Sequence, residues 1–167
     1  NSGWVFASET CALDIIGAKF LREVKPGEMV VVNEKGLTSI QIEKGKQKLD
    51  IFEFVYFARP DSYLLGKSVE SIRQNLGIEL AKEHKVRADI VVPVPDSAIP
   101  AALGFSRESG IPFTTGLIKN RYVHRTFISP EEHTRDRIVQ LKLNPMRHVL
   151  KGKRVIVIDD SIVRGTT

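Results

Sequence analysis

Cysteine is almost absent from this chain of 167 residues, which contains only Cys11. A single cysteine excludes an internal disulfide framework and any cysteine-rich metal site. The Cys11 thiol is therefore expected to be a small buried apolar group. Because nothing calls for an oxidising compartment, the default expectation is a cytoplasmic protein.

Long apolar runs are missing as well. No stretch approaches the length of a membrane span, and the first residues do not form a signal peptide, so no membrane partner is expected. Walker loop, dinucleotide fingerprint, zinc-protease motif and serine-hydrolase elbow are all absent. The four histidines have no metal-ligand spacing, which excludes the common histidine-based metal sites.

Negative charge is scarce in one region. The whole chain carries a net charge of +5, but residues 119–154 contain ten Lys or Arg against three acidic residues. A basic segment favours either nucleic acid or a small polyanionic substrate. Because there is no RNA-binding aromatic signature and no zinc-finger spacing, a pyrophosphate-bearing ligand is the more economical explanation.

The first 49 residues predict a β-rich layer without a site of its own. Strands are expected at residues 4–7, at 28–32 and, half-buried, at 37–42, with a short helix over residues 8–17. The polar residues 45–48 then mark a seam, which places a domain boundary between residues 49 and 50.

Beyond the seam, strands and helices alternate. Strands are predicted at residues 51–57, 88–94 and 113–117, and helices from Val69 towards His84, with an apolar face of Val69, Ile72, Leu76 and Leu80, and over residues 98–109. A polar helix or helix pair is expected over residues 131–150, broken at Asn144 and Pro145. This rhythm is typical of an α/β domain with a parallel sheet.

Residues 154–167 hold the densest group of chemically useful side chains. The apolar run 155–158 predicts a buried parallel strand that stops at Asp159 and Asp160. Ligands of open α/β sheets bind beyond the carboxyl ends of strands. Two carboxylates can accept hydrogen bonds from a sugar diol or hold a hydrated divalent cation, and the glycine-containing loop 161–167 can surround a phosphate. The alternative is a solvated acidic turn.

Two other loops are candidates for the same site. Residues 93–97 follow a strand, so Asp96 and Ser97 would face Asp159 and Asp160 across a cleft, unless they only cap the next helix. Residues 119–130 are too polar and basic for a core strand. They suit a lid that closes over an anionic substrate, with a solvated surface loop as the alternative.

The string 155–167 resembles the phosphoribosyl pyrophosphate signature of type I phosphoribosyltransferases. Four more strings, residues 8–14, 52–62, 93–97 and 120–128, are similar to the amidophosphoribosyltransferase family, in consistent order along nearly the whole chain. The resemblance implies that residues 1–49 are the C-terminal part of an Ntn-type glutaminase domain. Residues 50–167 would be the N-terminal part of an α/β phosphoribosyltransferase domain. We therefore expect an internal segment of a longer protein.

The function that this resemblance implies is the first committed step of purine biosynthesis. Ammonia from glutamine would displace pyrophosphate from phosphoribosyl pyrophosphate and give phosphoribosylamine. The glutaminase nucleophile would lie upstream of Asn1, since Cys11 is internal and has no free α-amine. Mg²⁺ is the implied cofactor, purine nucleotides the implied feedback inhibitors, and a homo-oligomer the implied assembly, without nucleic acid.

The resemblance also assigns site residues. Ser97, Asp159 and Asp160 match positions that coordinate Mg²⁺ directly or through the substrate. The predicted catalytic set has two parts. Its loop residues match the family's flexible loop over the substrate, and they are Arg121, Tyr122, Arg125 and Thr126. Lys142 matches a lysine that contacts the pyrophosphate. The substrate-binding set comprises Asp96, Ser97, Asp159, Asp160, Ser161, Ile162, Val163, Arg164, Gly165, Thr166 and Thr167.

One position departs from part of the family. Some members carry an iron–sulfur cluster with a cysteine ligand where this chain has Asp50, which puts a cluster of that kind in doubt. Two other functions stay open at this point. One is a different type I phosphoribosyltransferase, and the other is a module that senses phosphoribosyl pyrophosphate without turnover.

Overall fold

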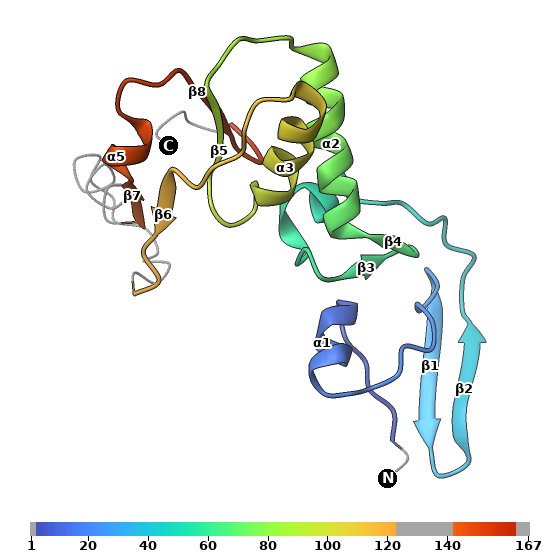
Figure 1. Ribbon diagram of the computed structural model, residues 1–167. Coiled ribbons are helices and arrows are strands. Elements are labelled where there is room, and N and C mark those ends of the chain that lie inside the picture. The colour runs from blue at the N-terminus through green and yellow to red at the C-terminus, as the bar shows by residue number, and fades with distance from the viewer. Residues whose placement is uncertain (1–2, 123–141, 163–167) are drawn as a thin grey trace, which may run out of the picture. The chain divides into compact units, whose positions relative to one another are not determined.

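The computed structural model of this protein describes residues 3–122 and 142–162. The chain divides into two compact units, Asn1–Val69 and Glu70–Thr167 (Figure 1). The domain boundary predicted between residues 49 and 50 falls inside the first unit. It stays a prediction, because one compact unit can contain the end of one domain and the start of the next.

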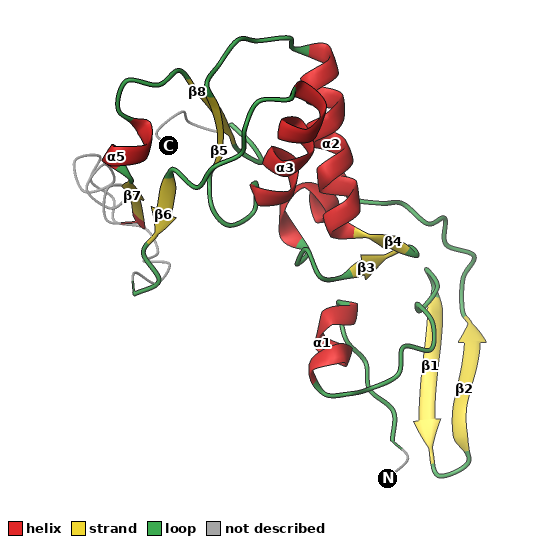
Figure 2. Ribbon diagram, viewed as in Figure 1, coloured by secondary structure: helices red, strands yellow, loops and turns green. Residues whose placement is uncertain are grey.

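The first unit begins with a short helix and a hairpin. Helix α1 (Thr10–Ile15) ends just before Gly17, whose φ of 66° reverses the chain. Strand β1 (Glu28–Asn33) pairs antiparallel with β2 (Gly36–Gln41), which confirms the strands predicted at residues 28–32 and 37–42. Residues 4–7 form no strand, so that prediction was wrong (Figure 2).

Strand β2 was predicted to be half-buried, but most of its residues are exposed, as are most of β1. Among the described residues, the two strands pair only with each other. The sequence patterns identified both strands correctly, but they do not show what covers each strand.

The aromatic segment after the seam is helical, not the strand that its composition predicted. Asp50 accepts the backbone N–H of Phe52 through Oδ1 at 3.0 Å, and the wider turn of η1 (Glu53–Phe57) follows. The N–H of Ala58 bonds to the carbonyl of Glu53 at 3.0 Å, five residues back. The Asp50 cap and the lack of a pairing strand among the described residues override the aromatic β-propensity.

A second, smaller hairpin closes the first unit. It consists of β3 (Tyr63–Leu64) and β4 (Lys67–Ser68). Ser62, at its start, is fully buried, and its carbonyl accepts the N–H of Val69 at 3.0 Å. Val69 is in turn the first residue of the long helix α2 (Val69–Glu83), which was predicted from its sequence.

The second unit contains the predicted parallel pair. Strand β5 (Ile90–Pro93) is buried along its whole length and pairs in parallel with β8 (Val155–Ile158), with Ile90 opposite Val155. Helix α3 (Ile99–Ser109) follows β5 and ends at Gly110, as predicted. The third strand predicted at residues 113–117 is reduced to a single parallel bridge between Phe113 and Val91.

A separate antiparallel pair joins β6 (Leu117–Lys119) to β7 (Leu143–Pro145), with the short helix α5 (Arg147–Leu150) after it. The break predicted at Asn144 and Pro145 is confirmed, and α5 lies within the predicted range 131–150, but the pairing of residues 143–145 as a strand was not predicted. The part of that range over residues 131–141 lies outside the described residues.

Helices α2 and α3 lie against each other through glycines. A Cβ atom added to Gly77 would come within 1.8 Å of the Ala101 carbonyl oxygen, and one added to Gly104 within 1.9 Å of the Gln74 carbonyl oxygen. This contact also corrects the predicted face of α2, because Leu76 and Leu80 are 45% and 37% exposed.

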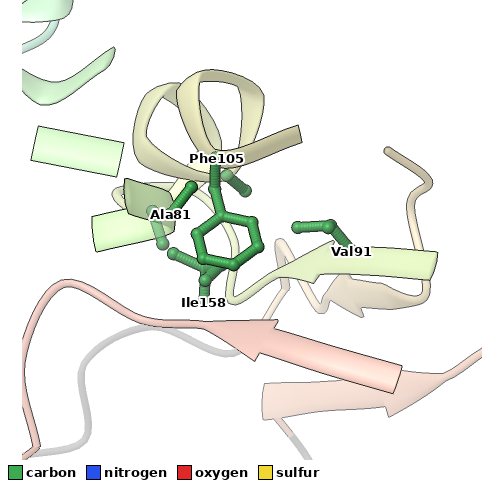
Figure 3. Close-up of a cluster of buried hydrophobic side chains, with 6 residues drawn as sticks. Ala81, Val91, Phe105 and Ile158 are labelled. Carbon is green, nitrogen blue, oxygen red and sulfur yellow. The ribbon is translucent and has the colours of Figure 1, made fainter. Parts of the chain in front are cut away.

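The core of the second unit gathers where α2, α3 and the parallel pair meet. Figure 3 shows Phe105 of α3 among Ala81, Val91 and Ile158. All four are at most 5% exposed, so the cluster joins both strands to α2 and α3. Among the described residues, no helix has the length and apolarity that a membrane crossing requires.

Candidate functional site

The ends of β5 and β8 bring the candidate site together. Because the strands are parallel, both carboxyl ends reach the same edge of the sheet, β5 at Pro93 and β8 at Ile158. The ladder continues one step further, since the N–H of Val94 donates to the carbonyl of Ile158 at 2.8 Å. Asp159 therefore starts beside the loop of residues 93–97.

Asp160 accepts hydrogen bonds from two hydroxyl groups at this edge. Its Oδ2 atom accepts a short hydrogen bond from the Ser97 hydroxyl, and its Oδ1 atom accepts one from the Ser161 hydroxyl at 2.7 Å. Ser97 and Asp160 are 63 residues apart in the sequence. The structure thus joins two residues of the predicted site, while their chemical roles stay predictions.

Asp159 has a different environment. It is partly buried, and burial raises the pKa of its carboxyl group. The N–H of Asp160 donates to Asp159 Oδ1 at 2.9 Å and acts in the opposite direction, whereas the neighbouring Asp160 charge adds to the rise. A cation bound here would relieve both unfavourable effects.

The loop before α3 carries a further ionic contact. Lys119, at the end of β6, donates from Nζ to Asp96 Oδ2 at 2.8 Å, and both side chains are largely exposed. The peptide bond between Pro95 and Asp96 is cis. Lys119 is the first residue of the predicted lid, residues 119–130, but it was not among the predicted site residues.

Three residues of the predicted catalytic set are described but do not reach the carboxylates. Arg121 and Tyr122 lie in the turn after β6, and the Tyr122 side chain is 94% exposed. Lys142 precedes β7, and its carbonyl accepts the N–H of Asn120 at 2.8 Å. In the described ranges, no hydrogen bond or ion pair links the side chains of these three residues to Asp159 or Asp160.

Other predicted residues cannot be placed. Arg125 and Thr126 of the basic loop, and Val163, Arg164, Gly165, Thr166 and Thr167 of the phosphate loop, lie outside the described residues. Ile162, the last described residue, is 90% exposed. The predicted phosphate loop is therefore represented here only by Ser161 and Ile162.

The described donor set fits a hydrated Mg²⁺ ion. Mg²⁺ binds oxygen ligands and usually keeps several waters, so one or two carboxylates are enough. Asp159 and Asp160 supply such oxygens, with the Ser97 hydroxyl at the Asp160 carboxylate. No group of three or more His, Cys, Asp or Glu side chains among the described residues could form an all-protein metal cage.

A hollow of about 1320 Å³ lies in the first unit and is lined by residues between Gly3 and Leu65. None of the predicted site residues lines it. The chemically equipped edge at the ends of β5 and β8 and this hollow are thus formed by different residues.

Comparisons with known proteins give a consistent result. No family model matches the sequence. The chain is 56% identical over 165 residues to the amidophosphoribosyltransferase of Synechocystis and 52% identical over 168 residues to that of Bacillus subtilis. These matches cover 98% and 100% of the chain. Over its whole length, the chain belongs to the amidophosphoribosyltransferase family.

Solved structures agree with this family. One described as the allosteric regulatory enzyme of purine biosynthesis matches with a TM-score of 0.85 and 52% identity over 96% of the chain. The B. subtilis glutamine phosphoribosylpyrophosphate amidotransferase, complexed with ADP and GMP, matches with a TM-score of 0.85 and 51% identity. The predicted mixture of helices and strands and the predicted family are thus confirmed.

The chain spans about a third of the amidophosphoribosyltransferases that it matches, 33% of the Synechocystis protein and 35% of the B. subtilis protein. Within this span, Asp50 does not offer the thiolate that an iron–sulfur cluster requires. Its carboxylate instead caps the backbone N–H of Phe52. This position therefore does not fit such a cluster.

Proposed function

We propose that this chain is the central part of a glutamine-dependent amidophosphoribosyltransferase that acts in the cytoplasm. The observation that carries the proposal is the junction of Ser97 with Asp160 at the shared end of β5 and β8, in a chain more than 50% identical to enzymes of that name. Residues 1–49 would complete an Ntn-type glutaminase domain, and residues 50–167 would begin the transferase domain.

The reaction consumes glutamine, water and phosphoribosyl pyrophosphate. Glutamine hydrolysis gives glutamate and ammonia. A bond then forms between the ammonia nitrogen and C1 of the ribose as the bond from C1 to pyrophosphate breaks, which gives phosphoribosylamine. In the full-length protein, purine nucleotides would inhibit this step, and several copies of the chain would assemble.

The residues divide the work by their chemistry. Asp159 and Asp160 accept hydrogen bonds from the ribose hydroxyls, since ionised carboxylates are acceptors only. Residues 161–167 hold the ribose phosphate through hydroxyls and backbone N–H groups. The pyrophosphate lies near Asp96 and Ser97. Arg121, Tyr122, Arg125, Thr126 and Lys142 neutralise and enclose it as it departs.

Mg²⁺, held by Ser97, Asp159 and Asp160 directly or through the substrate, would supply charge neutralisation on the leaving pyrophosphate. The rise in the pKa of Asp159 supports this assignment, because its ionised form is disfavoured by burial and by Asp160 until a cation is present.

The test is calorimetric titration of the full-length protein with phosphoribosyl pyrophosphate and Mg²⁺. We expect the Asp159→Asn, Asp160→Asn double variant to weaken binding about 100-fold or more, since each hydrogen bond to a charged group contributes about 1.5–3 kcal/mol. The control is the Asp14→Asn, Glu34→Gln double variant, which removes the same charge at exposed positions.

Undiminished binding in the Asp159 and Asp160 variant would refute the placement of the site. Turnover then separates the remaining functions. Pyrophosphate release supported by glutamine identifies the proposed enzyme, and release that needs a different acceptor identifies another phosphoribosyltransferase. Binding without any release identifies a sensing module.

A further inference from the structure

Residues 59–65 lie near the start of the predicted transferase part and donate hydrogen bonds to acceptor groups from the predicted glutaminase part. Glu9 Oε2 accepts the backbone N–H of Arg59 at 2.8 Å and the hydroxyl of Ser62 at 2.8 Å. Ser62 is fully buried, so its hydroxyl has no access to water. The Glu9 carboxylate is therefore the acceptor that satisfies this buried donor.

Two more acceptors continue the same pattern. Thr10 Oγ1 accepts the N–H of Tyr63 at 2.8 Å, and Glu23 Oε1 accepts the N–H of Leu65 at 2.7 Å. We call Glu9, Thr10 and Glu23 the acceptor clamp. It takes three backbone donors within seven residues, and every one of these bonds spans more than 40 positions of sequence.

The clamp holds the point from which α2 starts. Ser62, bonded to Glu9 through its hydroxyl, accepts the N–H of Val69 through its carbonyl at 3.0 Å. Val69 is fully buried and is the first residue of α2. A change at Glu9 or Thr10 would therefore alter the position of the first turn of α2, which leads into the rest of the predicted transferase domain.

We propose that the acceptor clamp makes Glu9, Thr10 and Glu23 positioning residues, which dock the start of the transferase domain on the glutaminase domain so that ammonia from glutamine is used for transfer. This inference rests on the proposed function. Ammonia is small and neutral and escapes readily into water, so its use requires the two domains to keep a fixed alignment. Three directed hydrogen bonds supply such an alignment, which apolar contact alone would not specify.

The test uses the full-length protein and variants that alter the clamp without touching the ribosyl site. Thr10→Val keeps the shape of the side chain but removes the acceptor for Tyr63, and Glu9→Gln removes the charge that strengthens two bonds. Thr10→Ser restores the hydroxyl, and Glu34→Gln is the charge control at an exposed turn. Three rates are measured: glutamine hydrolysis, ammonia-dependent synthesis and glutamine-dependent synthesis.

We expect the yield of phosphoribosylamine per glutamate to fall about tenfold in Thr10→Val and Glu9→Gln, within the range of couplings between distinct sites. Glutamine hydrolysis and ammonia-dependent synthesis should stay within about twofold of wild type. That change is much smaller than the tenfold change, which corresponds to 1.4 kcal/mol. Thr10→Ser should restore the yield. Hydrogen exchange at the Tyr63 amide should accelerate in Thr10→Val and not in Thr10→Ser.

An unchanged yield in both variants would overturn the inference. So would an equal loss of all three rates together with a lower unfolding temperature, because that pattern indicates general destabilisation. A wild-type protein that makes no phosphoribosylamine from either nitrogen source would instead refute the proposed function, and the hydrogen-exchange result would then show separately whether the docking exists.

Discussion

At the scale of single residues, one ion pair joins the residues that precede β5 and β8, the two strands of the parallel pair. Asp89 precedes β5 and Arg154 precedes β8. The Asp89 carboxylate accepts bonds at 2.8 Å from both the guanidinium and the backbone N–H of Arg154. These two donors lower the pKa of Asp89 to about 2, the guanidinium having the larger effect.

We predict that Asp89→Asn lowers the free energy of unfolding at neutral pH. An aspartate in an unfolded chain has a pKa of about 3.9, above the folded value, so the ionised pair stabilises the fold above about pH 4. That contribution is lost as the pH falls from about 4 towards about 2. Urea unfolding should therefore show a difference between wild type and variant that shrinks over this window.

The control for this experiment is Glu83→Gln, which removes an exposed carboxylate at the end of α2. A pH-independent difference between Asp89→Asn and wild type would contradict the assigned role of the charge. The contribution is expected to be modest, because both side chains are substantially exposed.

Sequence reasoning located the carboxylates of the site but not all of their partners. Asp159 and Asp160 followed from an apolar run that stops at two acids, and their nearness to Ser97 followed from the rule that parallel strands end at one edge. The contact of Lys119 with Asp96 did not follow, because it depends on how β6 is placed after the sheet. The acceptor clamp left no pattern, since its bonds join residues that are distant in sequence.

At the scale of elements, α2 and α3 come close to each other at two glycines. Gly77 and Gly104 each face a backbone carbonyl of the opposite helix, so neither position has room for a Cβ atom. The absence of side chains there lets the two helix backbones approach each other more closely than branched residues would permit.

We predict that Gly77→Ala and Gly104→Ala each destabilise the protein by about 1–3 kcal/mol, the usual cost of overpacking. The higher helix propensity of alanine would act in the opposite direction by about 1 kcal/mol, so a net loss shows that the steric effect dominates. The measurement is the urea midpoint. Asn75→Ala, on the exposed side of α2, is the control and should be neutral or slightly stabilising.

The same helix shows why an element can be predicted while its buried face is not. The apolar spacing of Val69, Ile72, Leu76 and Leu80 identified α2 correctly. Its closely packed side nevertheless runs through Gly77 and Ala81, because small residues fit where another backbone is near. The strand predicted at residues 51–57 was wrong for another reason. The cap at Asp50 favours a helical turn there, and this effect outweighed the β-propensity of the aromatic residues.

At the scale of the whole molecule, the only cysteine is structural. Cys11 is 5% exposed and lies inside α1, with its thiol near the Glu9 carboxylate at 3.8 Å. A glutaminase nucleophile must be reached by its substrate, and Cys11 is not accessible enough for that role.

We predict that the chain of 167 residues, taken alone, releases no glutamate from glutamine. Cys11→Ser in the full-length protein should leave the rate of glutamine hydrolysis within about twofold of wild type, since the thiol takes no part in the chemistry. Enzymatic detection of glutamate checks both statements. Loss of hydrolysis in a Cys11→Ser protein with an unchanged unfolding temperature would show that Cys11 is the nucleophile after all.

The pairing of β5 with β8 has a consequence for folding during synthesis on the ribosome. Asp89 and Arg154 are 65 residues apart, so β5 leaves the ribosome well before its partner strand exists. At about 5–20 residues per second, an apolar strand waits roughly 3–13 s with an open edge. During that interval it can pair with a neighbouring nascent chain. Changes that delay or weaken β8 should therefore reduce the yield of native protein in the cell before they alter any property of the finished molecule.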